Sequence, residues 1–248
     1  TGFDDTPTQD FFNGLTDSTI HQAVNDWITA GTTKDNVISK YRTIENWNTS
    51  NVTNMSSLFL SKSSFNDDIT NWNVSNVTNM VGMFQNAAAF NKPIGSWDVS
   101  NVTDMRYMFF GAAAFNQPIG SWNVSNVTDM GAMFQNAAAF NQDIRFWSIN
   151  QDVELNTMFD GATTMINKYS ETNGFGTADN SYTPRQEFFK QTSTFQPRDK
   201  DELIDALDDY FEGSNTYRTV SSSGLEDYGD INTWDVSNVI DMSRLFIG

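Results

Sequence analysis

The sequence contains no cysteine and a single histidine, His21. The absence of cysteine excludes disulfides, thiol nucleophiles and cysteine-ligated metals. Basic residues are also scarce: 14 Lys and Arg stand against 31 Asp and Glu, which gives a formal net charge of −17. A surface of this charge repels nucleic acid and anionic membranes, so we expect no nucleic-acid partner. It suits divalent cations and basic partners.

Long hydrophobic runs are missing as well. No apolar run approaches the roughly 20 residues that a membrane span needs, so we expect no span in this segment. Thr1 is not an initiator methionine, so we expect a processed or truncated start, and the lack of a signal peptide decides nothing about secretion. The chain does have 38% hydrophobic and 14% aromatic residues, which is enough to bury a core.

Tryptophan recurs at one interval. Trp47, Trp72, Trp97, Trp122 and Trp147 are each 25 residues apart, and a typical unit reads SWDVSNVTDMRYMFFGAAAFNQPIG. A period of this length is typical of a solenoid, in which each unit stacks on its neighbours because it is too short to bury its apolar side chains alone. The opening I-x-x-W-x-V has the spacing of a short strand, and the later M-x-x-M-F-x-x-A that of a helical or 3₁₀ turn.

Residues at equivalent positions of successive units should face one another. We expect the Trp rings, together with the Met and Phe columns, to pack on their copies in the next unit. The recurring Asn and Thr side chains should satisfy turn backbone groups of adjacent units. Four of these asparagines are also N-x-S/T sequons, and so candidate glycosylation sites in a eukaryotic secreted protein: Asn51, Asn76, Asn101 and Asn126. The repeat explains them more simply.

A longer self-similarity divides the chain into modules. Phe3 matches Phe175, the pair Thr6-Pro7 matches Thr183-Pro184, and Phe11-Phe12 matches Phe188-Phe189. The helical pattern TIHQAVNDWI likewise returns as ELIDALDDYF. The predicted organisation is a linker (1–15), a helical N-terminal cap (16–44), an array of about five coils (45–170), a second linker (171–198), and the cap helix and first coil of a second array (199–248).

The caps close the ends of the coils. The first cap helix is predicted at about 16–30, with Thr16 or Asp17 as N-cap and Gly31 just past its end. A single coil after the second cap would lack neighbours. We therefore expect residues 230–248 to continue into further coils, or to stack on a neighbouring subunit.

The stretch FNQPIGSWNVSNVTDMGAMFQNAAAFNQDI resembles the BspA-like leucine-rich-repeat surface proteins, the group that includes tandem-repeat lipoproteins of mycoplasmas. The resemblance covers residues 40–165 strongly and 230–248 again. It implies an α/β repeat fold: a right-handed, leucine-rich-repeat-like solenoid with one short strand and one helical or 3₁₀ turn per coil, capped by the amphipathic helix. It also implies an extracellular or cell-surface, non-enzymatic, adhesive or antigenic protein. It brings no catalytic residues.

The residues themselves favour binding over catalysis. Serines and threonines lie in a repeated register rather than beside a unique base, so no catalytic residue is predicted. The only aromatic and basic cluster at variable positions is Arg106, Tyr107 and Phe110, a candidate contact site. No cofactor is expected, except possible calcium on oxygen ligands, for which the candidates are Asp4, Asp5, Asp179, Asp227 and Asp230. Solvated surface acids are the alternative for these.

Two functions follow from these patterns. The first is a surface protein that displays its variable loops to a protein or a glycan. The second is a structural subunit of an extracellular fibre, in which copies of the module join head to tail.

Overall fold

The computed structural model describes residues 14–31, 34–172, 174–176, 182–189, 218–221 and 224–227, the last two ranges as backbone only. The chain forms two compact units, Thr1–Lys190 and Gln191–Gly248. In the second unit, strands β1 (Arg218–Ser221) and β2 (Gly224–Asp227) pair antiparallel. Apart from these strands, the cap helix and first coil of a second array, predicted at 199–248, lie outside the described residues.

Two helices precede the repeats in the first unit: α2 (Ile20–Thr29) and α3 (Asp35–Tyr41), followed by the 3₁₀ turn η1 (Ile44–Asn46). Helix α2 buries Ile20, Ala23, Val24 and Trp27, which share one face at helical spacing. The predicted N-cap was wrong. Thr19 occupies that position without a side-chain cap bond, because the carboxylate of Asp17 bonds to the first repeat unit instead. Gly31 follows the helix with a φ of +61°, as predicted for a helix end.

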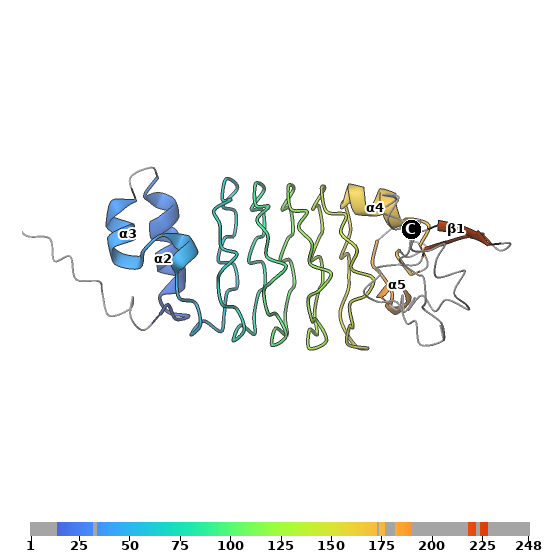
Figure 1. Cartoon of the computed structure of the whole chain (residues 1–248), viewed down its shortest axis with the longest axis horizontal. Coiled ribbons are helices and arrows are strands. Elements are labelled where there is room, and N and C mark those ends of the chain that lie inside the picture. Colours follow the sequence, from blue (N-terminus) through green and yellow to red (C-terminus); the bar gives the residue numbers. More distant parts are fainter. Residues whose placement is uncertain are drawn as a thin grey trace, which may run out of the picture. The chain divides into compact units, whose positions relative to one another are not determined.

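The repeat units lie in a row between α2 and α4 (Figure 1) and are joined by a repeated set of backbone hydrogen bonds. In one unit, alternate N–H groups donate to carbonyls of the next unit, at distances of 2.7 to 3.0 Å: Met80 to Asp104, Gly82 to Arg106, Phe84 to Met108 and Asn86 to Phe110. The N–H groups between them donate three residues back within their own unit, as Met83 does to Met80. Backbone polarity is thus satisfied both within and between units.

The secondary structure expected inside each unit is replaced by turns. Residues 47–162 contain neither a helix nor a strand, and neighbouring units share single parallel bridges, such as Asn79 with Asp104. The reason is a left-handed residue at two places in every unit. Tyr107 has a φ of +56° and Gly111 a φ of +65°, and neither an α-helix nor a β-strand accommodates such values.

The interior is built from rows of aromatic rings. Phe84 stacks on Phe59 and on Phe109, with ring centroids 5.4 and 5.5 Å apart. A second row contains Phe65, Phe90, Phe115 and Phe140, whose neighbouring centroids lie 5.8 to 6.1 Å apart. Ring stacking of neighbouring tryptophans holds for Trp47 and Trp72, 5.8 Å apart, whereas Trp97 and Trp122 stack on the Phe row. Each buried ring stabilises the fold by about 1.5 to 3 kcal/mol, so these positions serve packing.

Both ends of the row of repeat units are covered. At the first unit, Asp17 accepts hydrogen bonds from Thr53 and Asn54, and His21 Nε2 donates to the carbonyl of Ser56. At the last unit, helix α4 (Thr163–Tyr169) leads to Phe175 and helix α5 (Gln186–Phe189). The described part of the segment predicted as a linker at 171–198 therefore packs on the array: Phe175 and Phe188 are at most 1% exposed.

Candidate functional site

The side chains that differ most between units lie at three positions after each Trp: the ninth, tenth and thirteenth. We call these positions the outer row. Its members, unit by unit, are Ser56, Ser57 and Leu60; Val81, Gly82 and Gln85; Arg106, Tyr107 and Phe110; Gly131, Ala132 and Gln135; and Asn156, Thr157 and Asp160. The positions between them hold only Met, Leu and Phe and are buried. The outer row varies because, unlike those positions, it does not stack on a copy of itself, although its members Gly82 and Ala132 are buried.

Arg106 links two units electrostatically. Its Nη2 donates to Asp104 Oδ2 at 2.9 Å, and its Nε lies 3.4 Å from Asp129 Oδ2 in the following unit. The hydrogen bond and charge of Asp104, with the charge of Asp129, raise the pKa of Arg106. Burial raises the pKa of Asp129, an effect that the N–H of Gly131 and the charge of Arg106 oppose. The guanidinium therefore stays charged and is held in place, although its side chain is 46% exposed.

Tyr107 stands out from the surface beside Arg106. It is 42% exposed, and its ring meets the edge of the Phe110 ring at a centroid distance of 6.0 Å and an interplanar angle of 70°. Among the described residues, the exposed large hydrophobic side chains are Ile38, Leu60 and Tyr107, of which the last two belong to the outer row. The structure thus brings the predicted cluster of Arg106, Tyr107 and Phe110 together on one surface, and its role in binding stays a prediction.

A hollow of about 310 Å³ lies next to this cluster. Its lining comes from three successive units: Arg106, Tyr107, Asp129, Gly131, Ala132, Glu154, Asn156 and Thr157. It offers a guanidinium, two carboxylates, an amide and an aromatic ring, a combination that binds polar ligands by hydrogen bonds and ring contact. Asp129 and Glu154 were not predicted as site residues, although each follows a Trp of the repeat, Trp122 or Trp147, at the same distance in the sequence.

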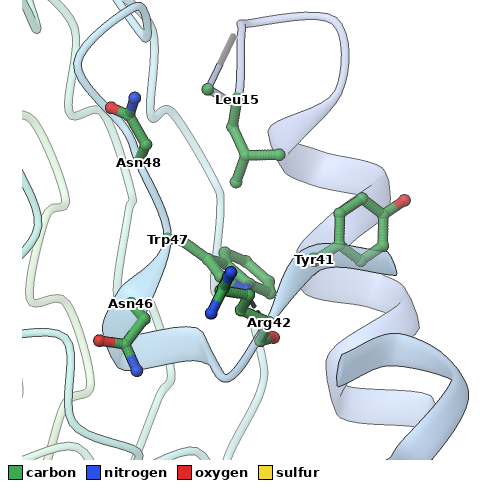
Figure 2. Close-up of a pocket in the computed structure, with 7 residues that line it drawn as sticks. Leu15, Tyr41, Arg42, Asn46, Trp47 and Asn48 are labelled. Carbon is green, nitrogen blue, oxygen red and sulfur yellow. Dashed lines mark hydrogen bonds between the residues drawn. The ribbon is translucent and has the colours of Figure 1, made fainter. Parts of the chain in front are cut away.

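A second hollow, of about 400 Å³, lies where the cap meets the first unit and is lined by Gly14, Leu15, Tyr41, Arg42, Asn46, Trp47 and Asn48. Figure 2 shows Asn46 and Asn48 on one side of Trp47 and Tyr41 on the other. The two rings are only 5% and 7% exposed, and that of Trp47 packs against Trp27 and Trp72. Since its aromatic residues belong to the core, this hollow is the weaker candidate.

The remaining predicted sites divide into described and undescribed residues. Asp4, Asp5, Asp179 and Asp230 lie outside the described residues, and Asp227 is the last residue of β2, described as backbone only. Within the described part of the chain, no three His, Cys, Asp or Glu side chains group as metal ligands would. The calcium prediction therefore stays untested.

The sequon asparagines have a structural role. The Nδ2 atoms of Asn76, Asn101 and Asn126 donate to serine carbonyls of the preceding unit at 2.7 to 2.8 Å. The expected asparagine ladder is confirmed for these three residues. Because Nδ2 is also the atom to which a glycan would be attached, glycosylation would compete with the contact between units.

Comparisons with known proteins agree with the repeat pattern. The model of the family described as "Mycoplasma protein of unknown function, DUF285" matches residues 9–101, 30–124, 68–174, 92–200 and 214–248. These overlapping matches show that the chain is a tandem-repeat protein. No curated protein and no solved structure matches it. Among the residues described, no helix has the length and apolar character needed to cross a membrane.

Proposed function

The chain belongs to this Mycoplasma family of unknown function, and from that premise we propose that it is a non-enzymatic surface protein that binds a protein or glycan through its outer row. The observation that carries the proposal is the contrast between the uniform interior and the variable outer row. Arg106, Tyr107 and Phe110 form its most exposed aromatic and basic cluster. Exposed aromatic and Arg side chains are enriched at protein interfaces.

A leucine-rich-repeat-like solenoid of the BspA-like type is the fold we propose for the array. The bonds from each unit to the next, 24 residues on, and the unbroken Phe row support it. In such a fold every unit presents its outer residues on the same side, so several weak contacts add along one surface. We propose an extracellular or cell-surface location for the same reason that we propose adhesion: the resemblance of the repeat to that group.

The absence of catalysis is also part of the proposal, and the partners of the polar side chains support it. His21, the only histidine, bonds to the backbone of Ser56. Asp17 and Asp98 accept hydrogen bonds from Thr53 and Ser100. These groups stabilise turns and the junction between cap and array.

A matched variant tests the outer row. The triple substitution R106G/Y107A/F110Q gives the third unit the outer residues of the fourth, which the same backbone already accommodates. The parent chain and the variant are tested on arrays of glycans and extracellular-matrix proteins. We expect the variant to lose at least about 10-fold in affinity for whichever probe the parent binds, as for loss of an interface anchor. Equal binding by a variant with an unchanged melting temperature would show that the cluster is not the contact site.

A further inference from the structure

The hollow beside Tyr107 is formed by small residues of one unit that lie between larger residues of its neighbours. The fourth unit has Gly131 and Ala132 at the first two outer-row positions, and Ala132 is buried, so it belongs to the floor of the hollow. The neighbouring units have larger side chains there, which help to enclose about 310 Å³: Arg106 and Tyr107 in the third unit, and Asn156 and Thr157 in the fifth. The hollow is therefore shaped by the variable outer row and not by the stacked interior.

Carboxylates outnumber cations around this hollow. Asp104, Asp129 and Glu154 occupy the same position in three successive units, and each is joined to the next by a parallel bridge. Arg106 places its guanidinium between the first two, with Nη2 2.9 Å from Asp104 Oδ2 and Nε 3.4 Å from Asp129 Oδ2. The three carboxylates and this guanidinium together carry a formal charge of −2.

Glu154 has no cationic partner within the described part of the chain. Its Oε2 accepts a hydrogen bond from the Asn156 amide at 3.0 Å, and none of the salt bridges between described residues includes it. Burial and the charges of Asp104 and Glu154 raise the pKa of Asp129. The hollow thus holds negative charge that a bound cation would compensate.

Tyr107 adds an aromatic ring to the lining of the hollow. It is 42% exposed, and its ring is supported by the edge-to-face contact with Phe110 at a centroid distance of 6.0 Å. The face of an aromatic ring attracts a cation. A guanidinium fits such a site best, because its flat surface stacks on a ring while its N–H groups donate to carboxylates.

We propose that the hollow binds an arginine side chain of a partner protein, with Tyr107 in contact with the guanidinium and Glu154 and Asp129 as its acceptors. This inference rests on the proposed function, because it assigns a partner chemistry to the same outer row. The net charge of −17 also favours the approach of a basic protein. An anion would be repelled from the hollow, and a neutral sugar would leave the charge of Glu154 uncompensated, so the observations favour a protein over a glycan.

Two peptides test the charge of the ligand. The probe is acetyl-Gly-Arg-Gly-amide, and its control carries citrulline, which keeps the size of arginine without the positive charge. Both are titrated onto the parent chain at low ionic strength, because salt screens exposed ion pairs, and binding is followed by saturation-transfer NMR. We expect the citrulline peptide to bind at least about 5-fold more weakly, since it forms neither of the two ion pairs.

Three variants of the parent chain test the site. E154Q removes one charge and should weaken binding of the arginine peptide by about 2- to 5-fold, the effect of one exposed ion pair. D152N removes a charge of the same unit that does not line the hollow, so it should leave the affinity unchanged. G131N/A132T gives the fourth unit the outer residues of the fifth and fills the hollow, so it should abolish binding without changing the melting temperature.

The outcomes separate this inference from the proposed function. Equal binding of the two peptides, or equal effects of E154Q and D152N, would overturn the inference. A lysine peptide that binds as tightly as the arginine peptide would rule out recognition of the guanidinium. If R106G/Y107A/F110Q loses a glycan or matrix protein that the arginine peptide does not displace, the outer row is a binding surface but this inference is wrong. If that triple substitution costs no affinity for any array probe, the proposed function itself fails.

Discussion

Two tryptophans in neighbouring units allow the energy of one buried hydrogen bond to be measured inside a single protein. Trp97 and Trp122 are 4% and 3% exposed, and each stacks on the Phe row at 6.3 and 6.4 Å with the same angle of 27°. Trp122 Nε1 donates to the carbonyl of Ile94 at 3.2 Å. Trp97 Nε1 is buried and makes no hydrogen bond within the described part of the chain.

Replacing each tryptophan by phenylalanine removes similar packing from both sites, so that contribution nearly cancels in the difference. W122F also loses a hydrogen bond worth about 0.5 to 1.5 kcal/mol, whereas W97F removes an unsatisfied buried donor that costs about 1 to 3 kcal/mol. We therefore expect W122F to destabilise the protein more than W97F by the sum of the two, which is at least about 1.5 kcal/mol. This corresponds to a melting temperature lower by at least roughly 3 °C.

Urea unfolding of the full chain, followed by far-UV circular dichroism, measures both losses without relying on tryptophan fluorescence. W147F is the control, because Trp147 Nε1 also donates to an isoleucine carbonyl, that of Ile119, at 3.0 Å. W147F should therefore lose as much stability as W122F. Equal losses at Trp97 and Trp122, or a larger loss at Trp97, would refute the reasoning.

Three further predictions concern polar residues of the array. The pKa of Asp17 is lowered, because hydrogen bonds from Thr53 and Asn54 outweigh the opposing effect of burial. D17A should therefore cost about 1 kcal/mol of stability at pH 7, the value of a lost hydrogen bond. The difference in stability between D17A and the parent should vanish as the pH falls through that lowered pKa, as measured by acid titration of stability. Burial raises the pKa of Asp129, so its charged form is disfavoured in the folded protein. D129N, which copies Asn79 of an earlier unit, should therefore be more stable than the parent at pH 7 by under about 1 kcal/mol and equally stable at a pH where Asp129 is protonated, as measured by thermal melts. A loss of stability at pH 7 would contradict this. N101A removes a hydrogen bond of 2.7 Å to the carbonyl of Ser75 and should lower the free energy of unfolding in urea by about 0.5 kcal/mol. When the parent is expressed in a eukaryotic secretory host, glycosidase should leave the mass of the peptide that contains Asn101 unchanged.

The features of the fold and the candidate site that could be predicted from the sequence depend on residues that are adjacent or evenly spaced in the chain. The period of Trp47 to Trp147 gave the units and their interior, and Arg106, Tyr107 and Phe110 are close enough in the chain to be noticed as a cluster. The N-cap prediction failed because the partner of Asp17, Thr53, lies 36 residues away. Nothing in the residues around Asp17 shows that its carboxylate serves another unit.

Other features could not be predicted because they depend on contacts between units and not on residue type alone. The first of the two left-handed positions in each unit is occupied by Ser57, Gly82, Tyr107, Ala132 and Thr157, a mixture that carries no turn signature. Neighbouring units impose the conformation by accepting the N–H of each of these residues, except that of Thr157, which bonds to Thr183. The hollow beside Tyr107 needs Glu154 from two units further on, which only stacking brings near.

The same contacts explain why one part of each unit is uniform and another is free to change. Phe109 touches Phe84 on one side and Phe134 on the other, so any substitution there disturbs two interfaces, and the ring is kept in every unit. Tyr107 has no such constraint beyond its backbone conformation, since Gly82 and Ala132 occupy the equivalent positions. Exchanging outer-row residues between units should therefore leave stability nearly unchanged, whereas an F109A substitution should cost about 3 to 5 kcal/mol. It follows that the outer row can change without changing the contacts that hold the units together.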